Sequence, residues 1–322
     1  PHRLNRGRWL RPCRRALTAA LYIGFDCGTV GRMDASTPPD PAEPGLEVRT
    51  AFVRNRNALL ARADFGELFV DYYLHLGAHG IRLEPEIDAM FKRALAAFTL
   101  HCASRPRNEL TAWTINFQQP RVNLFLAGDN DTGIVTGRVF TEDVKEGPEN
   151  LFYADVVRGR QPRRRSAVSF EGDDPLAAVE RFYAQSEQRA GRYFRTAEEE
   201  FRLFAEHPDC DVAWLRGLDE SRAGTIEADE TVVPLERRCY RWHCGCNQRR
   251  MLEVLAPVMR SDPEGLFGGE PRLEMRCPRC AARHLVTREA LEAFVAAEGG
   301  PAPDRKSTRL NSSHANISYA VF

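Results

Sequence analysis

The chain contains four cysteines arranged as two closely spaced pairs. The first pair is Cys244-Gly-Cys246, and the second pair, Cys277-Pro-Arg-Cys280, follows after thirty residues. Thiolates are the ligands that Zn²⁺ takes in structural sites, where two pairs brought together by folding complete a tetrahedron. The pattern therefore predicts one Zn²⁺ bound by Cys244, Cys246, Cys277 and Cys280. The alternatives are a redox dithiol pair and unrelated cysteines in a core.

The two pairs differ in spacing. Cys277 and Cys280 have the ordinary spacing of a zinc knuckle, whereas the single residue between Cys244 and Cys246 is too short for the same turn. His243 and His284 lie close to the pairs in the sequence. Because four thiolates already complete the tetrahedron, we expect both histidines to pack nearby or to hydrogen-bond a ligand sulfur.

A fifth cysteine, Cys239, precedes Cys244 by five residues. One hypothesis makes it a resolving thiol that forms a disulfide with an oxidised Cys244. The alternative is an unpaired structural thiol. Mass mapping after mild oxidation separates the two.

Composition places the chain among ordinary globular proteins. It has 322 residues, of which 43% are hydrophobic and 28% charged, so it is long enough for one or two domains with a real core. The formal net charge is zero, which gives no overall attraction to a polyanion, and no run of about 18 apolar residues predicts a membrane span. Nine cysteines without a convincing export signal favour a reducing, cytoplasmic location over a disulfide framework.

Motifs of common enzymes are missing from the sequence. It contains no Gly-x-x-x-x-Gly-Lys phosphate loop, no Gly-x-Ser-x-Gly elbow and no His-Glu-x-x-His helix. We therefore predict a protein that is not an enzyme, with no catalytic residues, no small-molecule substrate and no cofactor other than zinc.

Both ends of the chain differ in composition from its body. Residues 1–47 are predicted to be non-native or disordered. Residues 1–32 are interpreted as translated upstream sequence before a start at Met33, with a degenerate secretory signal as the alternative, and residues 35–44 are a proline-rich lead-in. Residues 299–322 are predicted to be a disordered or artefactual tail, because the composition changes abruptly and resembles read-through of a sequencing adaptor.

The body of the chain predicts an α+β core domain over residues 48–196. Apolar residues recur at helical spacing over 86–102, after Pro85, and a helix capped by Asp174 begins at Pro175. Alternating or continuous apolar residues predict strands over 113–117, 122–126, 134–140, 151–157 and 167–170.

Residues 197–238 are predicted to be an acidic linker. From 197 to 236 there are twelve acidic residues against three arginines, and residues 237–250 then hold five arginines and no acid. The linker is either a solvated charged surface or a segment that attracts the basic stretch and holds a closed state.

Residues 239–298 are predicted to form a small zinc-binding domain. Asn247 is expected to cap one helix, residues 273 and 275 alternate in a strand that leads into Cys277, and Thr287 is expected to cap a last helix. Each cysteine pair is thus placed beside an ordered element.

With these elements in place, residues 50–296 resemble the heat-shock protein 33 family of redox-regulated chaperones. That family carries Cys-x-Cys and Cys-x-x-Cys, about thirty residues apart, in a C-terminal zinc domain. The segment Phe170-Glu171-Gly172-Asp173 and the helix end Ser186-Glu187-Gln188 also resemble family motifs. The chain departs from the family at Glu199-Glu200-Phe201-Arg202-Leu203, where members carry a Gly-Gly-Met stretch and a longer helical linker, so the resemblance implies weaker or different switching here.

The resemblance implies an ATP-independent holding chaperone, inactive when reduced and zinc-bound. Oxidation would form disulfides between Cys244 and Cys246 and between Cys277 and Cys280, eject zinc and unfold the zinc domain. The protein would then bind unfolded client proteins, and the resemblance suggests a homodimer in the oxidised state. Zinc-bound thiolates suit this role because oxidants attack thiolates rather than thiols.

Two other functions fit the sequence. A zinc-ribbon protein that binds nucleic acid would use a basic, aromatic stretch for phosphate contacts and base stacking. That stretch comprises Arg237, Arg238, Tyr240, Arg241, Trp242, Arg249 and Arg250. The other alternative keeps the fold and the zinc but no longer switches. The sequence also leaves the client-binding surface undecided. The candidates, each of which could instead be a core residue, are Phe201, Leu203, Phe204, Trp214 and Leu215.

Overall fold

The structure is a computed structural model that describes residues 45–298. The predictions made for residues 1–44 and 299–322 lie outside the described residues. The first strand begins at Leu46, two residues before the expected start of the core domain at 48.

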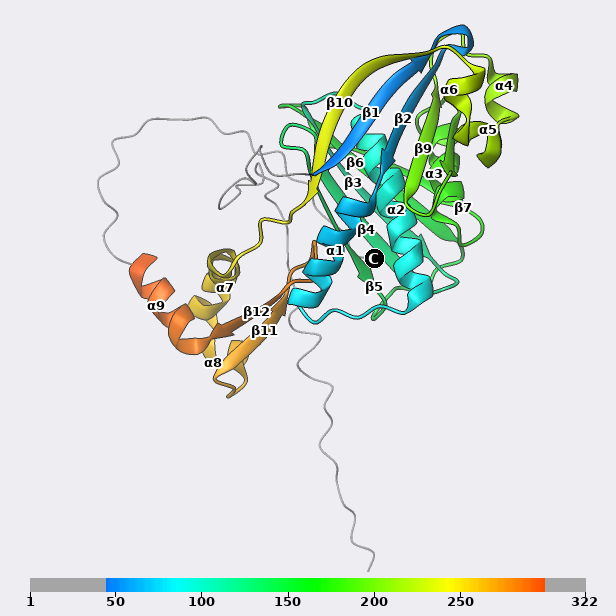
Figure 1. Cartoon of the computed structure of the whole chain (residues 1–322). Helices are drawn as coiled ribbons and strands as arrows, with labels where there is room; N and C mark the ends of the chain where they lie inside the picture. Colours follow the sequence, from blue (N-terminus) through cyan, green and yellow to red (C-terminus); the bar gives the residue numbers. More distant parts are fainter. Residues whose placement is uncertain (1–44, 299–322) are drawn as a thin grey trace, which may run out of the picture.

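The described residues contain a ten-stranded mixed sheet (Figure 1). Its strands are β1 (Leu46–Val53), β2 (Ala58–Asp64), β3 (Glu109–Phe117), β4 (Val122–Asp129), β5 (Ile134–Phe140), β6 (Asn150–Arg158), β7 (Arg164–Phe170), β8 (Gly191–Arg195), β9 (Glu200–Glu206) and β10 (Val232–Trp242). Their order is β7-β6-β3-β4-β5-β10-β1-β2-β9-β8. All five strands predicted in the core domain are confirmed.

Strand β10 joins the two halves of this sheet. It pairs antiparallel with β1 from Val232 to Tyr240, and its last two residues pair parallel with β5, Arg241 opposite Ile134 and Trp242 opposite Val135. The strand therefore carries the chain from the middle of the sheet directly to the first cysteine pair.

Three helices cover one face of the sheet: α1 (Gly66–Ala78), α2 (Pro85–Ala103) and α3 (Pro175–Gln185). Pro85 occupies the first turn of α2, and the Asp174 side chain accepts a hydrogen bond from the amide of Leu176, as the sequence predicts. The large aromatic core residues here include Phe91, Trp113 and Phe182. None of the helices within residues 45–298 has the length and apolarity needed to cross a bilayer.

The predicted acidic linker is ordered along most of its length. Strands β9 and β10 belong to the sheet, and three short helices lie between them: α4 (Val212–Arg216), α5 (Glu220–Gly224) and α6 (Ile226–Asp229). These helices form a second core with β1, β2, β8 and β9 that contains Trp214, Leu215 and Ile226. Periodicity missed these elements because the helices are short and the whole segment is densely charged.

The charge of this segment is matched by the sheet and not mainly by the basic stretch that follows it. Arg56 pairs with Asp211 and Glu230, each at 2.8 Å, and Arg202 of β9 pairs with Glu227 at 2.8 Å. One contact of the kind proposed between the acidic linker and the basic stretch is present, because Glu236 pairs with Arg238 at 2.7 Å.

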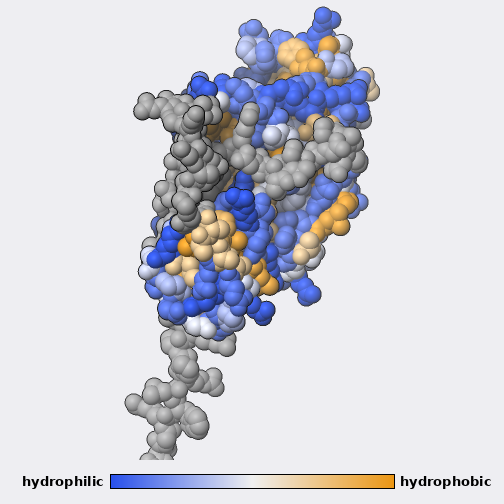
Figure 2. Space-filling view, turned by 90° about the vertical axis from the view of Figure 1, so that its left-hand side faces the viewer, coloured by the Kyte–Doolittle hydropathy of each residue, from blue (hydrophilic) through white to orange (hydrophobic). Residues whose placement is uncertain are grey.

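A small C-terminal module follows β10, comprising α7 (Gln248–Ser261), α8 (Pro263–Phe267), β11 (Arg272–Arg276), β12 (Arg283–Thr287) and α9 (Arg288–Glu298). Asn247 and Thr287 accept hydrogen bonds from the amides of Arg250 and Ala290, which confirms both predicted caps. The module has its own core, whose buried residues are Met251, Leu255, Met259, Leu266, Phe267, Val286 and Leu291. Figure 2 shows apolar side chains gathered on its surface, where Val254 and Val258 of α7 are exposed.

Two glycines give a matched test of how tightly the helices pack on the sheet. A Cβ at Gly137 of β5 would lie 2.6 Å from the Phe125 carbonyl oxygen and 2.8 Å from Phe91, whereas a Cβ at Gly77 of α1 would meet nothing within 4 Å. We expect Gly137→Ala to lower the free energy of unfolding by about 1–3 kcal/mol because of overpacking. Gly77→Ala should raise it by about 0.5–1 kcal/mol in urea titrations, since alanine favours the helix. Equal effects of the two changes would contradict this packing.

Candidate metal centre

The four predicted cysteines meet at one point of the C-terminal module. Cys244 and Cys246 lie in the loop between β10 and α7, and Cys277 and Cys280 lie in the turn between β11 and β12. Their sulfur atoms all lie within 4.8 Å of one another. Among the described residues this is the one cluster of three or more potential metal ligands that converges in this way.

The geometry fits a tetrahedral Zn²⁺. With zinc–sulfur bonds of about 2.3 Å, the sulfurs of a tetrahedron lie about 3.8 Å apart. The Sγ atoms of Cys244 and Cys277 are 3.6 Å apart, and those of Cys246 and Cys280 are 3.5 Å apart. Three of the four cysteines are nearly inaccessible, with Cys244 7% exposed and Cys277 and Cys280 each 2% exposed. A closed four-thiolate site of this kind is typical of structural zinc.

Gly245 explains how the short first pair reaches the site. Its backbone has φ of 69°, in the left-handed region where glycine carries no penalty from a Cβ. This turn lets both Cys244 and Cys246 present their sulfurs to one point although a single residue separates them. The glycine was visible in the sequence, but its conformation depends on the fold.

The second pair forms a compact knuckle, defined here as residues 277–282. The amide of Cys277 donates to the Ala282 carbonyl at 2.8 Å, and the amide of Ala281 donates to the Cys277 carbonyl at 2.9 Å. Ala281 takes a left-handed conformation with φ of 61°, which a residue with a side chain adopts only at a cost. The backbone of the knuckle is therefore fixed from within and places the sulfurs of Cys277 and Cys280 on one side.

The four thiols strongly perturb one another. Hydrogen bonds from the neighbouring thiols lower the pKa of Cys277 and of Cys244. Hydrogen bonds with the neighbouring thiols also raise the pKa of Cys246 and of Cys280. A divalent cation would replace the remaining thiol protons on binding.

His284 hydrogen-bonds a ligand sulfur, as the sequence predicts. Its Nε2 lies 3.4 Å from Cys246 Sγ, and burial lowers the pKa of His284. His243 lies outside the cluster, and its amide donates to the Val135 carbonyl at 3.0 Å. Outer-shell hydrogen bonds of the kind His284 makes orient metal ligands.

Cys239 does not join the cluster. It lies in β10 opposite Glu47, and its side chain is exposed. Its role as a resolving thiol stays a prediction.

The two aromatic residues of the nucleic-acid alternative pack within the protein, and one of them, Tyr240, is buried. Tyr240 is 1% exposed, and its hydroxyl lies 3.1 Å from Asn130 Oδ1. Trp242 packs against the ring of Tyr72, with centroids 5.2 Å apart. The neighbouring Arg238 is paired with Glu236. The aromatic residues of this stretch therefore contribute to packing, and nucleic-acid binding stays an alternative.

The sheet unit is defined here as strands β1 to β10 with helices α1 to α6. Three of its side chains form hydrogen bonds with the backbone of the metal centre, and the sequence analysis singled out none of them. His75 of α1 lies 2.8 Å from the Cys280 carbonyl oxygen through Nε2, and Arg138 of β5 donates to the Cys277 carbonyl at 3.0 Å. His79 accepts from the Arg283 amide at 3.2 Å. The spacing of His75 and His79, four residues apart on a helix, was a signal for a shared face, but nothing in the sequence related Arg138 to the cysteines.

Comparisons with known proteins agree with this arrangement. No family model matches the chain. The 33 kDa chaperonin of Proteus mirabilis (strain HI4320) is 22% identical over 199 residues, which are 50% of this chain and 68% of that protein. The crystal structure of the 33 kDa chaperonin from Thermotoga maritima, a heat shock protein 33 homolog, matches with a TM-score of 0.58 at 13% identity and covers 79% of this chain and 99% of that one.

Fold and cluster together define a two-part protein, in which a sheet unit carries a small four-cysteine module at its C-terminal side. The homologue in sequence and the neighbour in fold both support the heat-shock protein 33 family, so the resemblance predicted from the cysteine pattern is confirmed. The predicted fold class, an α+β sheet domain followed by a small four-cysteine domain, is confirmed as well.

We expect His284→Ala to weaken zinc binding without abolishing it. Loss of an outer-shell hydrogen bond costs about 10- to 100-fold in metal affinity, whereas loss of a ligand removes the site. Zinc affinity is measured by competition with a chromophoric chelator, and stoichiometry by release from the denatured protein. His207→Ala, at an exposed histidine far along the chain, is the matched control. A His284→Ala variant that holds no zinc would instead make His284 a ligand.

Proposed function

We propose that the protein is an ATP-independent holding chaperone controlled by the redox state of Cys244, Cys246, Cys277 and Cys280. In the reduced, zinc-bound state it is inactive, and in the oxidised state it binds unfolding proteins and prevents their aggregation. The observation that carries the proposal is the convergence of these four sulfurs at zinc-like distances, in a chain with chaperonin relatives. The proposal makes the protein a cytoplasmic stress-response factor with unfolded polypeptides as partners and no catalytic activity.

Zinc would stabilise a module whose own core is small. Seven buried residues form that core, which is too few to hold about fifty residues in one fold. A structural zinc site supplies roughly 10–16 kcal/mol of apparent binding free energy, which becomes folding free energy when the site forms only in the folded state. The four cysteines would thus tie the loop after β10 to the knuckle.

Oxidation would remove the ligands. Formation of each disulfide takes two electrons from two thiolates, and one molecule of peroxide accepts them and, with two protons, leaves as two waters. The family resemblance assigns the disulfides to Cys244 with Cys246 and to Cys277 with Cys280. Cys244 with Cys277 and Cys246 with Cys280 are also close enough to pair, so mass mapping of the oxidised chain decides between the two pairings.

The reduced structure hides the apolar residues that the sequence left open as client contacts. Phe201, Leu203 and Phe204 of β9 are 0–3% exposed, and Trp214 and Leu215 of α4 are 7% and 0% exposed. Helices α4 to α6 cover one face of the strands β1, β2, β8 and β9. A chaperone that is inactive when reduced must keep such surfaces covered.

A second candidate is a protein that keeps the fold and the metal but does not switch. One observation favours it: the segment from 197 to 238 is integrated into the sheet through β9 and β10 and is held by ion pairs to Arg56 and Arg202. Such a protein would suppress aggregation equally in both redox states, or in neither.

Light scattering of a thermally unfolding client tests the proposal directly. The purified chain is added either reduced and zinc-loaded or after peroxide treatment, and zinc release is followed in the same samples with a colorimetric chelator. We expect suppression of aggregation to rise together with the loss of about one zinc per chain. Zinc release without suppression of aggregation would contradict the chaperone function. The C-terminal module would then have a structural role alone.

A further inference from the structure

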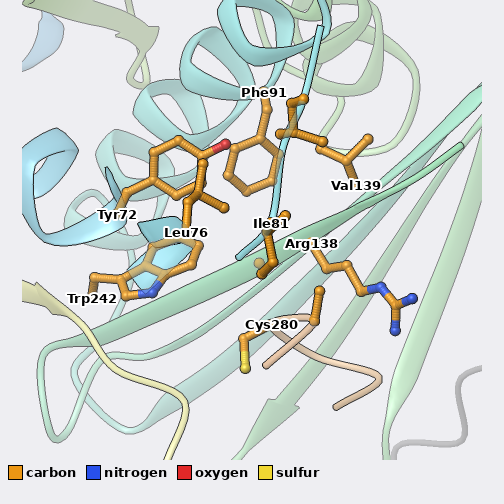
Figure 3. Close-up of a pocket in the computed structure, with 11 residues that line it drawn as sticks. Tyr72, Leu76, Ile81, Phe91, Arg138, Val139, Trp242 and Cys280 are labelled. Atoms are coloured by element: carbon orange, nitrogen blue, oxygen red, sulfur yellow. The ribbon is translucent and has the colours of Figure 1, made fainter. Parts of the chain in front are cut away.

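An apolar pocket lies where the C-terminal module touches the sheet unit (Figure 3). Tyr72 and Leu76 of α1 and Phe91 of α2 form one side, Val139 of β5 forms another, and Trp242 at the end of β10 lies along the edge. Trp242 packs against both aromatic rings, with centroids 5.2 Å from Tyr72 and 6.2 Å from Phe91. The wall is therefore made of large apolar side chains from four separate elements.

The knuckle of the metal centre closes this pocket. Cys280 and Ala281 line it from the module side, and the space that remains is about 20 Å³, enough for a single water molecule. Ala281 takes the left-handed conformation, with φ of 61°, in which glycine would carry no strain. Its methyl group is thus retained at a cost and adds apolar volume to the closure.

Two side chains of the sheet unit hold the knuckle in place. His75 Nε2 lies 2.8 Å from the carbonyl oxygen of Cys280, and Arg138 donates to the carbonyl of Cys277 at 3.0 Å. Both acceptors are backbone atoms of residues that also supply the metal-binding sulfurs. Any rearrangement of the backbone that follows loss of the metal would therefore change the position of both acceptors.

The uncovered pocket would suit one large apolar side chain of an extended polypeptide. Apart from Arg138, the side chains of its wall are aromatic and aliphatic, and the segment that lines it from the module side, Cys280 and Ala281, has small side chains. The indole Nε1 of Trp242 is buried and makes no hydrogen bond within the part of the chain that the structure describes. A backbone carbonyl of a bound segment would supply the missing acceptor.

We propose that the knuckle is a plug on this pocket, held by His75 and Arg138, and that the uncovered pocket binds a large apolar side chain of an unfolded client. The inference rests on the proposed chaperone function and names a surface that opens when the metal is lost. It assigns positioning roles to His75 and Arg138, which hold the plug through the backbone of the metal ligands.

The double variant His75→Ala, Arg138→Gln tests the plug in the reduced protein. We expect it to keep one zinc per chain, to exchange the amide hydrogens of residues 277–283 about tenfold faster than the wild type, and to enhance the fluorescence of anilinonaphthalene sulfonate severalfold. The control is His207→Ala, Arg164→Gln, at two exposed positions outside the interface. A zinc-loaded double variant with wild-type exchange and dye binding would overturn the plug.

A matched pair on α1 tests the pocket as the client site. Leu76 lines the pocket, whereas Leu74 on the same helix is 66% exposed and lies outside it. We expect Leu76→Gln to weaken binding of an unfolded client by the oxidised protein about tenfold, and Leu74→Gln to leave it unchanged. An equal or larger loss with Leu74→Gln would overturn the pocket in favour of the exposed face of α1.

The two failures are distinguishable. If oxidised wild-type protein binds no client, the proposed function fails and the client role of the pocket falls with it, while dye binding and hydrogen exchange of the double variant still report on the plug. If oxidised wild-type protein binds clients and Leu76→Gln binds them equally well, the chaperone function stands and the pocket is not its site.

Discussion

The rest of the structure depends on the convergence of four cysteine sulfurs at one point, where they would bind a single cation. The module that contains them has a small core of its own, with seven buried residues. The geometry of the site is prepared for this bond: Gly245 turns the first pair inward, and hydrogen bonds within the knuckle fix the second pair. A small module stabilised in this way loses most of its stability when its ligands are oxidised. In the proposed function, the chemistry of the thiolate and the stability of the fold would thus be coupled through the same atoms.

Strand β10 connects this site with the core of the protein. It lies between β1 and β5 in the sheet, and its last residue, Trp242, packs on α1 and α2 only two residues before Cys244. The knuckle returns to the same place from the other side, through contacts with His75 and Arg138. Both halves of the metal site therefore contact the sheet unit beside one apolar pocket, which is a short physical route from the cysteines to apolar surface.

The sequence was sufficient for the features that depend on local chemistry. The ligand types and spacing of Cys244, Cys246, Cys277 and Cys280, the helix caps at Asp174, Asn247 and Thr287, and the outer-shell bond of His284 follow from residue type and near neighbours. The acidic segment was harder, because β9 pairs with β2 and β10 pairs with β1, and both partners lie more than a hundred residues away in the sequence. The charge composition indicated a solvated linker there. In the structure, however, Asp211 and Glu230 both form ion pairs with Arg56.

The contacts of the metal site with the sheet unit could not be predicted from the sequence. His75 and Arg138 are ordinary residues of a helix and a strand, and only the fold places them at two carbonyl groups of the knuckle. Trp242 likewise suggested a surface for base stacking, although its ring packs against Tyr72. Long-range packing decides all three positions, and local periodicity carries no information about it.

Hydrogen exchange of the reduced protein, with and without zinc, tests the central claim most directly. Zinc is removed with a chelator under reducing conditions, so that no disulfide contributes to the result. If the stability of the module depends on zinc binding by the four thiolates, removal of zinc speeds amide exchange in residues 244–287 and in residues 75–83, at the end of α1 and just after it. Strands β3 and β4 stay protected. Unchanged exchange of the module after zinc removal would contradict it, because the fold of the module would then not depend on the four thiolates.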